Sequence, residues 1–294
     1  MKYYIKRGAG ELLFDFINVA VMLTLIVLML YPFMYVVLAS VSDPYAMIKH
    51  RGLLFAPIGR LTMSAYEAVF KNPDILTGYR NTLLYVAVGT SVNMIMTILG
   101  AYVLSRRGYK LKRFFSLMVV FTMFFDGGLI PFYIQVSSYG IANTMWAVIL
   151  PYAMTTYNLI LMRTAFAAMP QSLEESARID GANDLYIMWR IVVPLNVPII
   201  AVVALYYIVG HWNSWFRAMV FLRDRNKYPL QIFLREILAL SDTGRSTAPS
   251  LDRVELAATI RYATIIVSTL PVLMVYPFLQ RYFIKGIMLG AIKE

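Results

Sequence analysis

Acidic and small residues gather in one polar run, EESARIDGANDLYIMWRIVVP, which occupies residues 174–194. The run lies between stretches that are apolar enough to cross a bilayer. A membrane protein that keeps such a segment in water presents it to a partner. The chemistry that these side chains offer is therefore recognition of another macromolecule.

The first half of the run predicts a short helix and a tight turn. Pro170 stands at the helix start, and Ser172 followed three residues later by Glu175 fits a capping box. Gly181 suits the left-handed position after a helix, which gives this helix about two turns.

The second half predicts another helix that leads into the membrane. Asn183 or Asp184 can cap this helix, which runs through Tyr186 and Trp189. Pro194 then marks the point where the chain turns into the next span.

One face of the first helix is apolar and small. Leu173 and Ala177 share it by their i, i+4 spacing, while Glu174, Glu175 and Arg178 remain polar. Such a face fits a groove on a soluble protein. The alternative is a connector lying on the lipid surface, but anionic lipid favours basic helices, and this helix carries more acids than cations.

The composition predicts an all-α membrane protein, because 60% of residues are hydrophobic and 15% are charged. Crossing the hydrocarbon takes roughly 20 apolar residues. Charge-free intervals of that length are residues 16–42, 81–105, 191–216 and 262–280. The interval 114–162 holds only Asp126 and is divided by the turn-like residues 137–140. We therefore expect six helical spans, since backbone polar groups in lipid must be satisfied internally.

Several other classes are excluded or disfavoured. The first apolar run is about twice as long as a signal-peptide h-region and lacks a cleavage site, which predicts an uncleaved helix. The absence of cysteine excludes disulfides and thiolate metal sites, and with only His50 and His211 we expect no metal site. The net charge of +11 does not indicate nucleic-acid binding, because no basic stripe lies in a soluble domain.

The charge instead predicts orientation. Residues 106–113, RRGYKLKR, hold five cations in eight positions, so this short connection is expected in the cytoplasm. A bare count of cations does not decide the topology. The outer segments 43–80 and 217–261 are long and mix cations with acids. The polar run and both termini then lie inside, with Lys2, Lys6, Arg7, Arg281, Lys285 and Lys293.

The polar run resembles the EAA signature of permease subunits in bacterial type I ABC importers. Glu175-Ser176-Ala177, Asp180-Gly181-Ala182, Ile191 and Pro194 carry the resemblance. Ser176 replaces the usual Ala, and Val193 replaces the usual Leu; both are small changes.

Further matches follow in order along the chain from about Tyr79 to the end. They are Asn81-Thr82-Leu83, the segment AYVLSR at 101–106, GGLIP at 127–131, WNSW at 212–215, and Gln280-Arg281-Tyr282 with Lys285-Gly286. Together they resemble the carbohydrate-uptake branch, the maltose G permease-like or LplC-like family.

The resemblance implies the type I ABC importer permease fold, with residues 170–194 as the coupling loop. In this family the EAA segment is a helix that sits in a cleft of a cytoplasmic ATPase. The residues expected to couple to that ATPase are Glu174, Glu175, Ser176, Ala177, Asp180, Gly181, Ala182 and Pro194. No G-x-x-x-x-G-K-[ST] sequence is present, so the chain is not expected to be an enzyme, and ATP and Mg belong to partner ATPase subunits.

Polar and aromatic residues within the apolar spans are candidates for the substrate pathway. They are Asp126, Tyr133, Gln135, Asn158, His211, Trp212, Asn213 and Trp215. Each has a structural alternative. Asp126 precedes two glycines and can cap a broken helix near the outer face, and the segment WNSW can be an interfacial belt or a permease–permease contact.

The resemblance also divides the chain. We expect an N-terminal helix and outer loop at 1–78, the transmembrane domain at 79–281, and a cytoplasmic tail at 282–294. Residues 239–255 resemble the loop that reaches toward the solute-binding protein. Residues 286–294 resemble the segment that enters between the two ATPase subunits.

The predicted function is the permease half of an ATP-driven oligosaccharide importer in the bacterial cell membrane. Its expected partners are a second permease, two ATPases, an external binding protein, the sugar and membrane lipid. The GGLIP sequence resembles a subgroup that takes up acidic fragments such as those of alginate or rhamnogalacturonan. The alternatives are a secondary transporter or channel, which would need ion-coordinating residues in discontinuous helices, and a membrane-embedded enzyme such as a glycosyltransferase.

Overall fold

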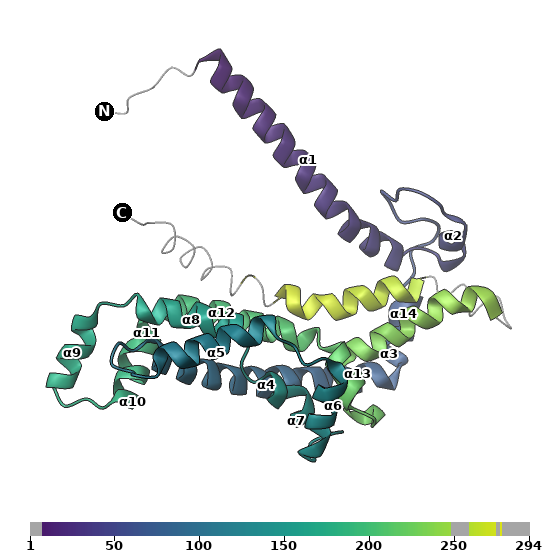
Figure 1. Ribbon diagram of the computed structural model, residues 1–294. Helices are drawn as coiled ribbons and strands as arrows, with labels where there is room; N and C mark the ends of the chain where they lie inside the picture. The colour runs from purple at the N-terminus through teal and green to yellow at the C-terminus, as the bar shows by residue number, and fades with distance from the viewer. Residues whose placement is uncertain (1–7, 248–258, 275–276, 278–294) are drawn as a thin grey trace. The chain divides into compact units, whose positions relative to one another are not determined.

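The computed structural model describes residues 8–247, 259–274 and 277, and every regular element in them is a helix (Figure 1). Some sequence predictions lie outside these residues. They are the N-terminal cations, residues 248–255 of the expected outer tip at 239–255, the matches at 280–286 and the tail at 282–294.

The chain divides into two compact units, residues 1–72 with 237–267, and residues 73–236 with 268–294. In the first unit lie α1 (Ala9–Ser40), α2 (Pro44–Lys49), α3 (Ser64–Lys71) and most of the helix Thr259–Met274. The long α14 (Leu230–Thr247) crosses the boundary between the units in sequence. The expected domain boundaries after residues 78 and 281 stay predictions.

The second unit holds the remaining elements. They are α4 (Pro73–Ser105), α5 (Lys112–Phe124), α6 (Leu129–Ser138), α7 (Met145–Ile149), η1 (Leu150–Tyr152), α8 (Thr156–Ala167), α9 (Gln171–Ile179), α10 (Asp184–Ile187), η2 (Met188–Val192), α11 (Val193–Leu195), α12 (Val197–Trp212), α13 (Trp215–Phe221) and η3 (Arg225–Lys227). Within this unit α9 and α10 project at one end, and α6, α7 and α13 lie at the other (Figure 1).

The helix α1 is apolar on all sides. Its most apolar stretch has a mean hydropathy of 2.5, and none of that stretch is buried within the chain. A helix that is hydrophobic all round is stable only when lipid or another helix covers it. The exposed apolar side chains of α1 therefore mark it as a candidate membrane-spanning helix.

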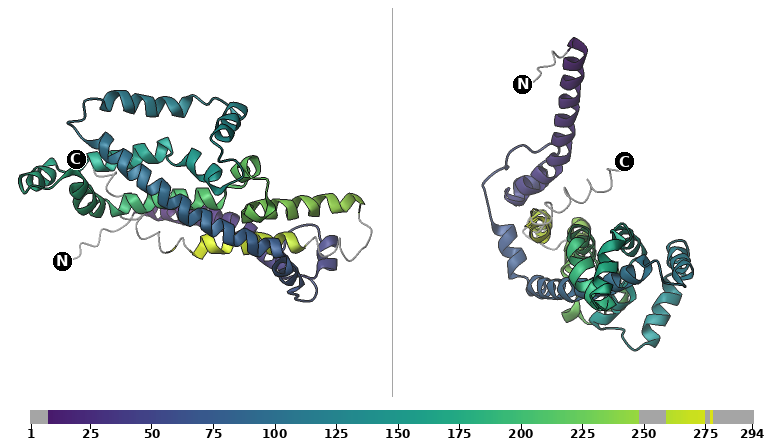
Figure 2. Two further views of the ribbon diagram at one scale, coloured as in Figure 1. Left: turned by 90° about the horizontal axis from the view of Figure 1, so that it is seen from below. Right: turned by 90° about the vertical axis from the view of Figure 1, so that its left-hand side faces the viewer.

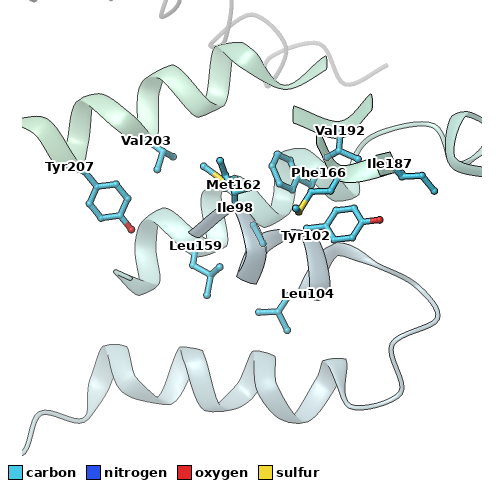
Figure 3. Close-up of a cluster of buried hydrophobic side chains, with 12 residues drawn as sticks. Ile98, Tyr102, Leu104, Leu159, Met162, Phe166, Ile187, Val192, Val203 and Tyr207 are labelled. Atoms are coloured by element: carbon cyan, nitrogen blue, oxygen red, sulfur yellow. The ribbon is translucent and has the colours of Figure 1, made fainter. Parts of the chain in front are cut away.

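The core of the second unit forms where α4 packs against α8 and α12. Figure 2 shows α4 as the long helix that runs the length of this unit. Figure 3 shows that Ile98 and Tyr102 of α4 meet Leu159, Met162 and Phe166 of α8 in one buried cluster. The cluster also includes side chains from α10, η2 and α12, namely Ile187, Met188, Val192, Val203 and Tyr207. One apolar core therefore joins the central helices to the projecting end.

Two helices, Gly10–Ser40 and Pro73–Ser105, are long and apolar enough to cross a membrane by themselves. Two bent pairs of helices also qualify if each is taken as one span: Met145–Tyr152 with Thr156–Ala167, and Asp184–Leu195 with Val197–Trp212. The described residues therefore give two to four candidate spans, and a shorter apolar helix covers Thr259–Met274. The prediction of an all-helical membrane protein is therefore confirmed, whereas the number of six spans stays a prediction.

The expected third span is interrupted. The helices α5 and α6 have 13 and 10 residues, each shorter than a bilayer requires, and the segment around Asp126 separates them. The side chain of Asp126 accepts a hydrogen bond of 2.9 Å from the backbone N–H of Gly128. Gly128 has a φ of +85°, which suits glycine, and serves as the N-cap of α6. The predicted helix break at Asp126 is therefore present.

A second break, at residues 153–155 between η1 and α8, is held by polar side chains of the neighbouring helices. Asn93 donates to the carbonyl of Tyr152 at 2.6 Å, and the hydroxyl of Tyr207 accepts from the N–H of Thr155 at 3.2 Å. His211 completes the arrangement, because its Nε2 lies 2.6 Å from Oδ1 of Asn93. Backbone groups freed by a break in an apolar region need such partners.

We predict that Gly89→Ala lowers the thermal stability of the purified protein. A Cβ at this position would lie 2.5 Å from the ring of His211, and the hydrogen bond to Asn93 holds that ring in place. Overpacking of this kind costs about 1–3 kcal/mol. Thermal unfolding in detergent measures the change as a lower Tm.

Gly210→Ala is the matched control, since it is also a helical glycine but a Cβ there would have no neighbour within 4 Å. Its Tm should be equal to or above that of the wild type. Equal Tm values for the two variants would contradict the close packing of Gly89 on His211.

Candidate coupling site

The predicted first helix of the polar run is α9, Gln171–Ile179. Its length of nine residues agrees with the expected two turns. The predicted capping box is wrong, however. Pro170 is the N-cap residue and makes no side-chain cap, so Ser172 already lies inside the first turn. Proline fixes φ and starts a helix by itself, which leaves the hydroxyl of Ser172 with no N-cap role.

The predicted turn after α9 is confirmed. Gly181 has a φ of +82°, and the N–H of Ala182 donates to the carbonyl of Ala177 at 2.9 Å. This bond, across the left-handed residue, closes the end of the helix. The side chain of Asn183 then caps α10 by accepting from the N–H of Tyr186 at 2.8 Å. Of the two cap residues considered, Asn183 is the one used.

The orientation of α9 differs from the predicted one. Ala177 does not form an outward apolar face with Leu173, because Ala177 packs against the core cluster whereas Leu173 is exposed. Glu174 lies on the same inward side as Ala177. The reason is tertiary: the small Ala177 allows a close approach to the bundle that the larger Leu173 does not.

An ion pair fixes this inward side of α9. Glu174 pairs with Arg106, and the two side chains are only 16% and 14% exposed. Beside them Arg107 donates to Oε1 of Gln171 at 2.8 Å. Both arginines belong to the basic connection after α4. The sequence indicated only an orientation signal in that connection and missed its role as the anchor of α9.

A further ion pair joins α9 to α10. A terminal nitrogen of Arg178 lies 2.6 Å from Oδ1 of Asp184, and the hydroxyl of Tyr102 donates to the same oxygen at 3.4 Å. The two helices and α4 are thus linked through one carboxylate. The opposite charges at 178 and 184 were visible in the sequence, but only the turn at Gly181 brings them together.

The outward side of α9 carries Ser172, Glu175, Ser176 and Ile179. All four are exposed, and Ile179 is 86% exposed. Glu175 makes no ion pair within the described part of the chain. An acid beside an exposed apolar side chain is a surface that can bind a basic and apolar groove.

Between α9 and α10 the surface is hollowed. The hollow has a volume of about 540 Å³. Its lining residues are Ala177, Asp180, Gly181, Ala182, Asn183, Tyr186, Arg190 and Ile191. Asp180, Gly181 and Ala182 of the EAA-like signature therefore border a depression at the projecting end.

Pro194 is not the point at which the chain turns. The helical path continues through a π-helical stretch, Met188–Val192, and through α11 to Leu195. The bend of 86° comes at Asn196, whose N–H and side chain both bond to the carbonyl of Val192. Proline lacks an N–H and disturbs the preceding turn, and the wider π-helical turn accommodates it.

Three of the predicted pathway residues are buried. Asn158 is 5% exposed on α8, His211 binds Asn93, and the indole N–H of Trp212 donates to the carbonyl of Ser268 at 3.1 Å. The ring of Trp212 also packs edge-on against Tyr79. The side chains of His211 and Trp212 therefore hold helices of the second unit together.

The other five pathway residues lie nearer the surface. Asp126, Gln135 and Asn213 are exposed. Tyr133 stacks on Phe221 and accepts a hydrogen bond from Arg223 at 3.0 Å. Arg235 covers the ring of the half-buried Trp215 at 3.7 Å. Backbone hydrogen bonds link neighbours in this segment, since the N–H of Trp215 donates to the carbonyl of Asn213 at 2.9 Å. Among the described residues, no side-chain hydrogen bond, ion pair or ring contact joins any two of the eight.

Comparisons with known proteins identify the family. No protein-family model matches the chain. Protein LplC of Bacillus subtilis is 39% identical over 266 residues, which cover 89% of this chain and 88% of LplC. The polygalacturonan/rhamnogalacturonan transport system permease protein YtcP of Bacillus subtilis is 37% identical over 289 residues, which cover 96% of this chain and 98% of YtcP. The chain is a carbohydrate ABC importer permease.

Solved structures agree with this assignment. In a crystal structure of a bacterial ABC transporter involved in the import of the acidic polysaccharide alginate, one chain superimposes with a TM-score of 0.84 at 31% identity. The match covers 95% of this permease and 99% of that chain. The permease is therefore a multi-pass, non-catalytic subunit of a binding-protein-dependent sugar importer. A secondary transporter, a channel and a membrane-embedded enzyme are no longer alternatives.

We predict that Gly181→Val loosens the α9–α10 turn of the permease. A side chain in the left-handed conformation costs about 1–2 kcal/mol, and more for a β-branched one. Hydrogen exchange of the backbone N–H of Ala182, which bonds to Ala177, should become faster.

Gly181→Asn is the control, because asparagine tolerates the left-handed region. Its exchange rate should stay close to that of the wild type. Slow exchange in the valine variant would mean that the turn does not depend on the freedom of a glycine.

Proposed function

We propose that this permease forms one half of the translocation pathway for an acidic oligosaccharide and transmits the motion of a cytoplasmic ATPase through α9. Its proposed partners are a second, different permease, two ATPase subunits that bind ATP and Mg, and an extracytoplasmic solute-binding protein. A solved alginate transporter of the same fold was crystallised with an alginate pentasaccharide-bound periplasmic protein, which supports the last of these partners.

The observation that carries the coupling role is the two-sided character of α9. Its inward side is fixed to the bundle by the Arg106–Glu174 pair, and its outward side exposes Glu175 and Ile179. A force applied to the outward side therefore reaches α4 directly. A helix attached only by its ends would yield instead of moving the bundle.

The membrane arrangement is part of the same proposal. Six spans in the bacterial cell membrane, with both termini in the cytoplasm, agree with the basic connection between α4 and α5. This orientation brings Arg106, Arg107 and α9 to the cytoplasmic side, where an ATPase can reach them. The segments 1–78, 79–281 and 282–294 remain the proposed divisions of the chain.

An acidic substrate is supported by relatives and by unpaired cations. One relative is named for polygalacturonan and rhamnogalacturonan, and the similar solved transporter imports alginate. In this chain Arg217 lies 3.6 Å from the ring centre of Tyr152, and Arg235 covers Trp215. Neither arginine makes an ion pair with any described residue. A guanidinium beside an aromatic ring suits the carboxylate and the flat face of a uronate sugar.

Substitutions of the adjacent acids Glu174 and Glu175 should separate the attachment of α9 to the bundle from its binding to the ATPase. Glu174→Gln leaves Arg106 without its acidic partner, a loss on the order of 3–5 kcal/mol. Both the thermal stability and the coupling of ATP hydrolysis to uptake should therefore fall. The charge swap Arg106→Glu with Glu174→Arg should recover part of both.

Glu175→Gln is the matched partner experiment, since this acid points outward. The permease should keep its Tm but retain less ATPase during gel filtration of the complex. If Glu175→Gln destabilised the permease itself, or Glu174→Gln left it unchanged, the two assigned roles of α9 would be wrong.

The substrate is tested with the complete importer in proteoliposomes. Binding protein loaded with a uronate oligosaccharide should stimulate ATP hydrolysis and uptake more than protein loaded with a neutral one. Arg217→Gln should raise the apparent KM for the uronate about ten-fold, because a charged hydrogen bond is lost, and should leave a neutral sugar unaffected.

Arg80→Gln is the control, because it removes an exposed cation on a different helix, α4, whereas Arg217 lies on α13. Equal effects of Arg217→Gln on acidic and neutral sugars would contradict the acidic substrate. Accumulation of solute by the isolated permease, without nucleotide or partners, would contradict the proposed function as a whole.

A further inference from the structure

A second hollow lies beside the basic connection that the sequence indicated only as an orientation signal. It has a volume of about 480 Å³ and is open on one side, between the start of α5 and the end of α8. Its lining residues are Tyr109, Lys110, Lys112, Arg113, Ser116, Leu117, Val120 and Arg163. Four of the eight are cations and none is an acid.

The four cations have no acidic partner among the described residues. Lys112 donates to the carbonyl of Ser105 at 3.3 Å, and Nε of Arg163 donates to the carbonyl of Leu104 at 3.3 Å. These two bonds fix both side chains at the end of α4. The terminal nitrogens of Arg163 make no further bond in the described chain, and Lys110 and Arg113 make none.

The electrostatics of the hollow favour an anion. Burial lowers the pKa of Lys112, and the nearby charges of Arg163, Arg106 and Arg107 lower it further. Like charges held this close repel each other, so a bound anion would relieve the repulsion. The hydroxyl of Ser116, in addition, is buried and has no hydrogen-bond partner in the described structure.

The other side of the hollow is apolar and continues along α5. Leu117 is 61% exposed and Val120 is 37% exposed. Further along the helix Phe121 and Phe124 are exposed by 60% and 84%, and α5 buries none of its residues. The surface is thus cationic at one end and apolar along α5. This arrangement matches a phospholipid, which has a charged headgroup and an apolar acyl chain.

We propose that this hollow binds the phosphate headgroup of an anionic phospholipid, with the acyl chain lying along Leu117 and Val120. The cations would bind the phosphate oxygens, and the hydroxyl of Ser116 would supply a further hydrogen bond. A soluble acidic protein fits less well, because the apolar side of the hollow continues onto a helix of the membrane region. A free phosphate would leave that side uncovered.

The site adjoins the attachment of α9. Lys112 and Arg163 hold the last carbonyls of α4, and the next residue, Arg106, pairs with Glu174. A bound headgroup would therefore neutralise charge beside the pair that fixes α9. The lipid site does not depend on the transported sugar, so its test is independent of the proposed substrate.

The test uses the complete importer in nanodiscs that contain phosphatidylcholine and a photoactivatable phosphatidylglycerol. After illumination, mass spectrometry should find the label on residues 109–124. Lys110→Gln with Arg113→Gln removes two exposed cations that have no partner within the chain, so the fold should survive. Each cation near anionic lipid contributes about five-fold to binding, so labelling should fall on the order of 25-fold.

Arg51→Gln with Arg60→Gln is the charge-matched control, because both cations are exposed and lie in the first unit. Its labelling should equal that of the wild type. Equal labelling by a photoactivatable phosphatidylcholine, or unchanged labelling of the Lys110 and Arg113 variant, would overturn the proposal.

Two further arms separate other anions from lipid. Complete displacement of the probe by inorganic phosphate would assign the hollow to free phosphate. Loss of the ATPase subunits from the Lys110 and Arg113 variant, with labelling unchanged, would assign it to a protein contact. Either result overturns the lipid site, whereas retained labelling in excess phosphate supports it.

Discussion

The attachment of α9 to the end of the bundle is the interaction on which the rest of this permease depends. A projecting helix transmits force only when its base does not yield, and the nearly buried Arg106–Glu174 pair fixes that base to α4. Arg178 and Asp184 join α9 to α10 in the same region. Breaking one partner of such a pair leaves a charge without compensation, so the attachment is sensitive to single substitutions.

The bundle behind this attachment must remain stable although several of its helices are broken. At the break before α8, side chains from α4 and α12 replace the backbone hydrogen-bond partners that a continuous helix would have supplied. His211, Asn93 and Tyr207 therefore serve the packing of three helices. These polar contacts and the apolar cluster around Met162 and Phe166 together join α4, α8 and α12. The same residues would be costly in lipid without these partners.

The basic connection between α4 and α5 contains cations of two kinds. Arg106 and Arg107 have partners on α9, and their charges are used within the chain. Lys110, Lys112 and Arg113, together with Arg163 of α8, surround a hollow without any acid. The first group explains how α9 is held, and the second is open to an external anion. A single stretch of sequence thus attaches α9 and also supplies three of the four cations of the proposed lipid site.

The sequence by itself determined the helical membrane class, the family and the local form of the coupling loop. Gly181 and Asn183 act as their residue types predict, because turns and caps depend on a few neighbouring residues. Asp126 likewise marks a helix break from its own local bond to Gly128. The tertiary structure decided which side of α9 faces the bundle, because Glu174 and Ala177 turn inward only when Arg106 and the core are present. It also decided that the chain bends at Asn196 beyond Pro194, and that His211 and Trp212 are buried between helices. The orientation of α9 and the burial of His211 and Trp212 rest on residues far apart in the chain, whose proximity no local pattern records.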